Sequence, residues 1–214
     1  MRRLRCCYHS GVPNSQRSFA RRELHTVFLD RDGVINEKMP EGQYVSAWSA
    51  FRLLPGVAKA IARLNGAGMR VVVVTNQRGV ALGLYTAADV EAIHAGLERL
   101  LEADGARVDG FFYCPHDKDA CSCRKPLGGL FEQAAARFTD IRAETSVMIG
   151  DSLSDIEFGR RLGMMTVFIE GDAERGDAER RKPGGEKASG MADLRFGSLA
   201  EAVEGLLGAG ARSG

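Results

Sequence analysis

Five short apolar runs, separated by segments with helical spacing, constrain the fold of this 214-residue chain more than any other feature. Each run is nearly continuous in large or β-branched apolar side chains, which is typical of strands buried on both faces of a sheet. The intervening segments repeat their apolar residues at intervals of three and four, as amphipathic helices do. This alternation predicts a mostly parallel sheet covered by helices on both faces, a Rossmann-like α/β fold of three layers. The predicted strands are 27–29, 69–74, 108–113, 146–149 and 165–169, and the predicted helices are 55–66, 86–104, 126–138, 156–162 and 199–207.

Composition and charge exclude several classes of protein. Hydrophobic residues make up 44% of the chain and charged residues 27%, which are the values of an ordinary globular domain. The net charge of +1 gives no overall field that would attract nucleic acid or an anionic membrane. No apolar run approaches the roughly 18 residues of a membrane helix. We therefore expect a small-molecule substrate, and neither a nucleic acid nor a membrane as partner.

The ends of the chain differ in composition from its centre. Residues 1–23 are rich in Arg and Ser, and we predict that they form a basic, disordered extension. The same composition also fits an organelle transit peptide or a basic arm that contacts phosphates. We predict one domain over residues 24–208 and a flexible tail over 209–214. Five cysteines, an odd count, and no secretory signal argue against a disulfide framework and for reduced, metal-binding thiols, so we expect a cytoplasmic protein. We also expect a monomer.

Reactive side chains follow four of the predicted strands. Asp30 and Asp32 come directly after the first strand, and two carboxylates at this spacing can share a hard divalent cation while one of them attacks and the other handles a proton. The carboxyl ends of parallel strands meet at one edge of a sheet, which is where open α/β folds bind their ligands. That edge would also carry Thr75 and Asn76 after the second strand, Lys125 beyond the third, and Asp151 with Asp155 after the fourth.

A second group of candidate ligands lies beyond the third strand, in Cys114-Pro-His116 and Cys121-Ser-Cys123. Three thiols and one imidazole within ten positions are a typical set for a closed, tetrahedral structural zinc site. The charged residues between them make plain burial of these cysteines improbable. Zinc binding here would fix the loop that leads into Arg124 and Lys125.

The motifs D-R-D-G at 30–33, T-N-Q at 75–77, R-K-P at 124–126 and G-D-S-L-S-D at 150–155 resemble those of the haloacid-dehalogenase-like (HAD) phosphatases. The resemblance spans residues 27–169 and implies a Mg²⁺-dependent phosphomonoester hydrolase with an aspartyl-phosphate intermediate. It implies Asp30 as nucleophile and Asp32 as general acid and base. Asp151, the Asp30 carboxylate and the Asp32 backbone carbonyl would hold Mg²⁺.

The same resemblance assigns roles around the phosphate. Thr75 and Asn76 would donate hydrogen bonds to the phosphoryl oxygens, and Lys125 would balance their charge. Asp155 would either orient Lys125 or cap the following helix.

The C-P-H…C-x-C-R-K-P loop resembles a capless subgroup of the family, whose members act on heptose bisphosphates or on histidinol phosphate. This likeness implies a sugar phosphate, D-glycero-D-manno-heptose 1,7-bisphosphate, which would lose its 7-phosphate. The predicted substrate-binding residues are Tyr44, Asn76, Gln77, Arg78, Arg124 and Ser152. Histidinol phosphate remains an alternative because Glu37 and Glu41 could bind an amine. A polynucleotide 3′-phosphatase and a non-catalytic zinc module are further alternatives.

Overall fold

The computed structural model describes residues 23–171 and 184–210. Six parallel strands form one sheet in the order β3-β2-β1-β4-β5-β6. The strands are β1 Thr26–Leu29, β2 Arg70–Asn76, β3 Gly110–Cys114, β4 Ser146–Gly150, β5 Met165–Ile169 and β6 Leu194–Phe196. The helices are α1 Val57–Gly66, α2 Ala87–Glu102, α3 Gly129–Arg137, α4 Leu153–Leu162, α5 Gly185–Met191 and α6 Leu199–Gly210, with short 3-10 turns η3 Trp48–Ala50 and η4 Ala143–Thr145.

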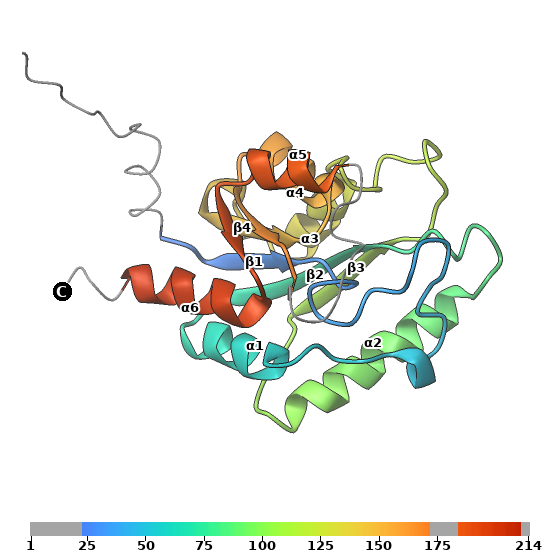
Figure 1. Cartoon of the computed structure of the whole chain (residues 1–214), viewed down its shortest axis with the longest axis horizontal. Coiled ribbons are helices and arrows are strands. Elements are labelled where there is room, and N and C mark those ends of the chain that lie inside the picture. Colours follow the sequence, from blue (N-terminus) through green and yellow to red (C-terminus); the bar gives the residue numbers. More distant parts are fainter. Residues whose placement is uncertain (1–22, 172–183, 211–214) are drawn as a thin grey trace, which may run out of the picture.

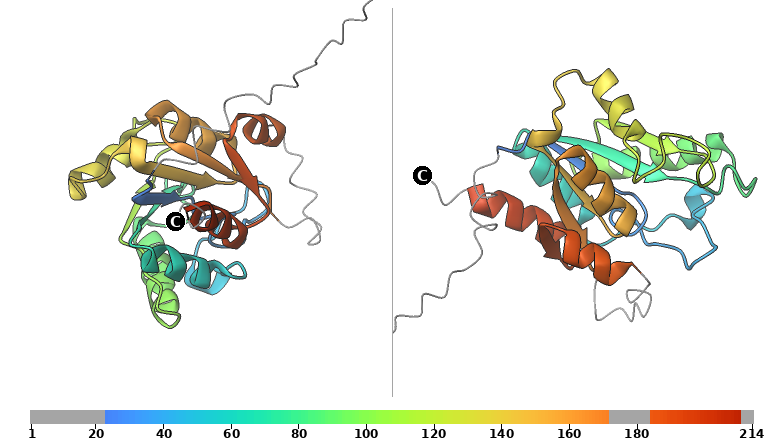
Figure 2. Two further views of the ribbon diagram at one scale, coloured as in Figure 1. Left: turned by 90° about the vertical axis from the view of Figure 1, so that its left-hand side faces the viewer. Right: turned by 90° about the horizontal axis from the view of Figure 1, so that it is seen from above.

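Helices cover both faces of the sheet (Figure 1). Alternate side chains of each strand point to opposite faces. Val27 and Leu29 therefore join one core with α1, α2 and α6, whereas Phe28 joins a second core with α3 and α4. The two further views show the same layering (Figure 2). The three-layer α/β fold predicted from the sequence is confirmed.

Local sequence signals explain where several helices begin and end. Thr86 caps α2 in a reciprocal capping box with Asp89, and Gly163 ends α4 in the left-handed conformation at φ 80°. Two predicted helices start later than expected. Pro55 lies in the turn before α1, whose cap is Gly56, and α3 begins at Gly129 after a turn that follows Arg124.

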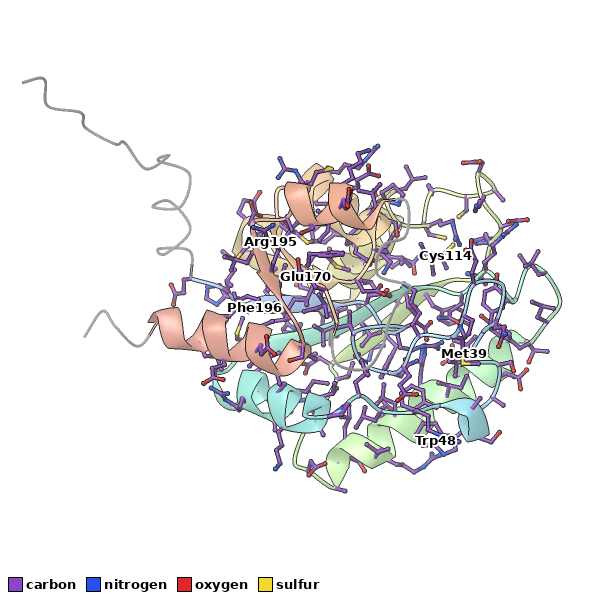
Figure 3. All side chains as sticks on the ribbon, viewed as in Figure 1. Met39, Trp48, Cys114, Glu170, Arg195 and Phe196 are labelled. Carbon is purple, nitrogen blue, oxygen red and sulfur yellow. The ribbon has the colours of Figure 1, made fainter. Side chains whose placement is uncertain are left out.

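The sequence reading missed β6 and α5. β6 has only three residues, and α5 buries only Ala188, so neither element produces a recognisable hydrophobic period. Phe196 of β6 packs against Gly205 of α6, at the edge of the core (Figure 3).

Parts of the predicted organisation lie outside the described residues. These parts are residues 1–22 of the basic extension, residues 172–183 of the predicted domain, and residues 211–214 of the tail. α6 includes residues 209 and 210, where the tail was expected to begin. Within the described ranges, no helix combines the length and the apolar character that crossing a bilayer requires.

Candidate active site

The strand ends converge because three adjacent strands run in register. Leu29 of β1 pairs with Val73 of β2 on one side and with Ile149 of β4 on the other. The N–H of Asp30 then donates to the Ile149 carbonyl at 3.0 Å and continues the ladder by one residue. Asp30 is thus placed at the centre of the sheet edge, where the strand order reverses direction and α/β folds open a crevice.

Three carboxylates meet at this point. One oxygen each of Asp30, Asp151 and Asp155 lies within 4.8 Å of the others, so the predicted approach of Asp30 to Asp151 is confirmed. Burial and the neighbouring Asp155 raise the pKa of Asp30 to about 7, although Lys125 opposes the change. Asp151 Oδ1 is buried and has no hydrogen-bond partner among the described residues. Crowded carboxylates and an unpartnered oxygen fit a hard divalent cation such as Mg²⁺.

Lys125 is the buried counter-charge of this cluster. Its Nζ donates to Asp30 Oδ1 at 2.9 Å and to the Val74 carbonyl at 2.7 Å, and it forms an ion pair with Asp155 Oδ1 at 2.6 Å. Burial alone would lower the pKa of Lys125, but the carboxylates of Asp155 and Asp30 raise it. The other Asp155 oxygen accepts from the N–H and the hydroxyl of Ser152 at the start of α4. Asp155 therefore both orients Lys125 and caps α4, which sequence reasoning treated as alternatives.

The Asp32 carboxylate is not part of the cluster of three carboxylates, and several side chains donate hydrogen bonds to it. Its carboxylate accepts from Arg31 Nη2 at 3.0 Å, from Asn36 Nδ2 at 2.9 Å and from Gln77 Nε2 at 3.0 Å. Burial opposes ionisation, but the guanidinium and these donors hold the pKa of Asp32 below its usual range. Arg31 is completely buried. Sequence reasoning missed Arg31 and Asn36, although a charged residue between two aspartates could have been read as a partner for one of them.

The end of β2 contributes side chains that hold the site together. Thr75 Oγ1 accepts from Gln77 Nε2 at 2.9 Å, and Tyr85 donates to Gln77 Oε1 at 2.8 Å. The Asn76 amide donates to the Lys125 carbonyl and accepts from the Lys125 N–H, each at 3.1 Å. Asn76 thereby fastens the Lys125 loop to the sheet.

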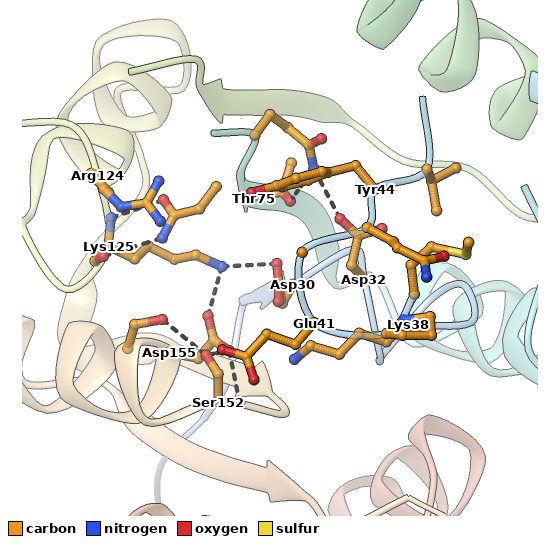
Figure 4. Close-up of a pocket in the computed structure, with 18 residues that line it drawn as sticks. Asp30, Asp32, Lys38, Glu41, Tyr44, Thr75, Arg124, Lys125, Ser152 and Asp155 are labelled. Atoms are coloured by element: carbon orange, nitrogen blue, oxygen red, sulfur yellow. Dashed lines mark hydrogen bonds and ion pairs between the residues drawn. The ribbon is translucent and has the colours of Figure 1, made fainter. Parts of the chain in front are cut away.

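A cavity of about 320 Å³ opens over these groups (Figure 4). The four predicted catalytic residues, Asp30, Asp32, Thr75 and Lys125, line it. Of the predicted substrate-binding residues, Tyr44, Asn76, Gln77, Arg124 and Ser152 line it as well. Arg78 does not: its Nε donates to Asp117 Oδ1 at 2.5 Å instead. One wall is the continuous segment 38–45, and sequence reasoning missed its Lys38, which pairs with Asp151.

The cysteine cluster has the dimensions of a tetrahedral metal site. Ligand atoms about 2.3 Å from a zinc ion at the corners of a tetrahedron lie about 3.8 Å apart. The thiol of Cys114 is 3.5 Å from Cys121 Sγ and 3.7 Å from His116 Nδ1, and Cys123 Sγ is 3.3 Å from both of these atoms. The four residues therefore fit one closed ion site, with no position left for substrate.

Comparisons with known proteins agree with this geometry. A HAD-hydrolase-like family model matches residues 122–194. The D-glycero-alpha-D-manno-heptose-1,7-bisphosphate 7-phosphatase of Mycobacterium tuberculosis is 42% identical over 176 residues, which are 82% of this chain and 87% of the relative. The corresponding beta-anomer phosphatase of Bordetella bronchiseptica is 38% identical over 148 residues, 69% of this chain and 81% of the relative.

Solved structures give the same result. The B. bronchiseptica D,D-heptose 1,7-bisphosphate phosphatase, complexed with magnesium and phosphate, has a TM-score of 0.73 at 33% identity and covers 86% of this chain and 99% of its own. The enzyme of the same name from Burkholderia thailandensis has a TM-score of 0.59 at 32% identity and covers 86% and 98%.

Proposed function

Because this chain belongs to the HAD-like family of heptose bisphosphate phosphatases, we propose that it removes the 7-phosphate from D-glycero-D-manno-heptose 1,7-bisphosphate. One observation carries the proposal: Asp30, Asp151 and Lys125 are far apart in the sequence but lie together at one edge of the sheet, in a chain 42% identical to a heptose bisphosphate phosphatase. Such a site can neutralise a phosphate and present a carboxylate to it.

Asp30 is the proposed nucleophile. Its carboxylate attacks phosphorus and forms an aspartyl-phosphate as the sugar oxygen leaves. Asp151, the Asp30 carboxylate and the Asp32 backbone carbonyl would hold Mg²⁺, which supplies positive charge to the phosphoryl oxygens. Lys125 would balance the same charge, because its Nζ lies 2.9 Å from Asp30 Oδ1. Thr75 supplies a hydroxyl donor at the phosphoryl group, and we assign the same role to the Asn76 amide.

Asp32 is the proposed general acid and base. In its protonated form it donates a proton to the leaving sugar oxygen in the first step. The ionised form, which the Arg31 guanidinium favours, then takes a proton from the water that hydrolyses the aspartyl-phosphate. Gln77 and Asn36 keep the Asp32 carboxylate fixed through both steps.

We propose zinc as the ion of the cysteine cluster, held by Cys114, His116, Cys121 and Cys123. Its role is structural, because it holds the loop that carries Arg124 and Lys125 into the cavity. The Arg78–Asp117 ion pair joins this loop to the segment that follows β2.

Recognition of the sugar falls to the walls of the cavity, among them Tyr44, Arg124 and Ser152. We propose the alpha anomer as the preferred substrate. Mycobacterial relatives named for that anomer match this chain over 176 residues at 42% identity, whereas five relatives named for the beta anomer match it over 135–154 residues at 37–40%. Histidinol phosphate is the second candidate, because Glu41 lines the cavity and could bind an amine (Figure 4).

The test is a panel of phosphate esters assayed with Mg²⁺: both anomers of heptose 1,7-bisphosphate, histidinol phosphate and a 3′-phosphorylated oligonucleotide. We expect the alpha anomer to give the highest kcat/KM and phosphorus NMR to show loss of the 7-phosphate alone. Faster turnover of histidinol phosphate, or release of the 1-phosphate, would refute the proposal. We further propose that the enzyme acts in the cytoplasm as a one-domain monomer. Size-exclusion chromatography with light scattering tests the oligomeric state.

A further inference from the structure

Lys38 extends into the cavity from the wall opposite Arg124 (Figure 4). It belongs to the segment 38–45 between β1 and η3, every residue of which lines the cavity. Its Nζ donates to Asp151 Oδ2 at 2.5 Å. The Lys38 side chain is 41% exposed and that of Asp151 14%, so the ion pair joins a largely buried carboxylate to a lysine that remains open to solvent.

The two lysines of the cavity differ in the number of oxygen atoms that contact their ammonium groups. Lys125 donates hydrogen bonds to Asp30 and to the Val74 carbonyl and forms an ion pair with Asp155, so three oxygens already surround its buried ammonium group. Lys38 has one described acceptor, Asp151 Oδ2, and keeps two N–H groups for another anion. The long, flexible stem of Lys38 is partly exposed, so its ammonium group can change partner without movement of the backbone.

Cation binding at Asp151 and the Lys38 ion pair use the same carboxylate. A divalent ion held by Asp30 and Asp151 would lie close to the Lys38 ammonium, and the like charges would repel each other. The ammonium would then lose its partner while remaining tethered at the cavity. An uncleaved phosphate of a bisphosphate substrate carries nearly two negative charges and needs such a partner away from Asp30.

We propose that Lys38 recognises the phosphate that is not cleaved, exchanging Asp151 for that phosphate when the divalent cation binds. This inference rests on the proposed function, since it assigns a residue to the second phosphate of that substrate. It makes Lys38 a specificity residue that favours bisphosphates over monophosphates. It also makes Lys38 a competitor of the cation in the absence of substrate.

The experiment compares Lys38→Met, which keeps the length of the stem, with Lys38→Arg and with Lys59→Met, an exposed lysine of α1, as control. The substrates are heptose 1,7-bisphosphate and p-nitrophenyl phosphate at saturating Mg²⁺. In Lys38→Met we expect the ratio of their kcat/KM values to fall about tenfold, equivalent to ~1.4 kcal/mol, chiefly through KM of the bisphosphate. Lys38→Arg should recover most of the loss, and Lys59→Met should leave the ratio unchanged. Equal losses on both substrates, or no loss on either, would overturn the assignment.

Two further measurements do not depend on turnover of heptose bisphosphate. Isothermal titration calorimetry without substrate should show that Lys38→Met binds Mg²⁺ several-fold more tightly than wild type; equal or weaker binding would overturn the exchange. Mannose 1-phosphate, which carries only the uncleaved type of phosphate, should inhibit p-nitrophenyl phosphate hydrolysis about tenfold less well in Lys38→Met. An unchanged inhibition constant would overturn the phosphate assignment. If wild type fails to hydrolyse heptose bisphosphate, the proposed function is wrong, and these two measurements still decide the role of Lys38.

Discussion

Replacing the proposed nucleophile should make the magnesium-free protein more stable while removing its activity. Burial, and then the Asp155 carboxylate, raise the pKa of Asp30 from 3.8 to about 7. A carboxyl with a raised pKa in the folded state costs stability as the pH rises from the unfolded pKa to the folded one. At 1.36 kcal/mol per pKa unit, the cost above pH 7 reaches ~4 kcal/mol. Asp30→Asn removes that cost because the amide carries no charge.

The gain is smaller than this ceiling because Asp30 lines an open cavity, where solvent screens part of the repulsion between the carboxylates. The opposing charge of Lys125 is already contained in the pKa of about 7, and Lys125 keeps the Asp155 and Val74 oxygens after the substitution. We therefore expect Asp30→Asn to raise the free energy of unfolding by about 1–3 kcal/mol at pH 8, which is ~3–10 °C in Tm for a chain of this size. The difference should shrink toward pH 5, where the wild-type carboxyl is protonated.

The assay is urea unfolding of both proteins at pH 5, 6.5 and 8 without added Mg²⁺, with zinc content measured in parallel. Asp140→Asn is the matched control, because it removes an exposed carboxylate that pairs with Arg70 on the surface and should bring no gain. Hydrolysis by Asp30→Asn should be at background. If Asp30→Asn is no more stable than wild type at pH 8, or if its advantage does not change with pH, the electrostatic reasoning is refuted. Residual turnover near wild type would remove Asp30 from the nucleophile role.

Three other substitutions probe the site. Gly33 and Gly42 both have left-handed backbones, at φ 97° and 82°, but only a methyl group at Gly33 would meet the Asp151 carboxylate. Both alanine variants should lose about 1–2 kcal/mol of stability, because alanine is strained in a left-handed backbone. Only Gly33→Ala should also bind Mg²⁺ roughly tenfold or more weakly in calorimetry. Equal affinities of the two variants would contradict this packing. Lys125→Met should cost about 3–5 kcal/mol in chemical denaturation, because it leaves buried carboxylates unpaired, and should lower kcat at least ~100-fold. Cys121→Ser should lose its zinc in elemental analysis and melt at a lower temperature, and an unchanged metal content would exclude the proposed ligand set.

The central sheet could be predicted from the sequence because its strands carry their own signal. The apolar runs at 27–29 and 146–149 mark strands buried on both faces, and the parallel rule then brings Asp30 and Asp151 to one edge. The meeting of their oxygens within 4.8 Å needed no knowledge of side-chain packing. The roles of the individual site residues stay predictions until the variants are measured.

Other features depend on contacts between distant parts of the chain and leave no local pattern. Lys38 lies in a segment without a hydrophobic period, and its partner Asp151 is 113 residues away. Arg78 looked like a phosphate ligand from its position after T-N-Q, but Asp117 of the cysteine loop accepts its hydrogen bond. The two possible roles of Asp155 could not be separated because one carboxylate performs both, through different oxygens.

The position of β1 in the sheet has a consequence for synthesis of the chain on the ribosome. β1 pairs with β2 on one side, but its other neighbour, β4, is made only after α1, α2 and α3. Until Ser146–Gly150 emerges, one edge of the most central strand has open hydrogen-bonding groups beside fully apolar side chains. A nascent chain that stalls before β4 therefore exposes an incomplete sheet with an unpaired, aggregation-prone strand edge. We expect such a chain to be bound by a chaperone or degraded by a protease.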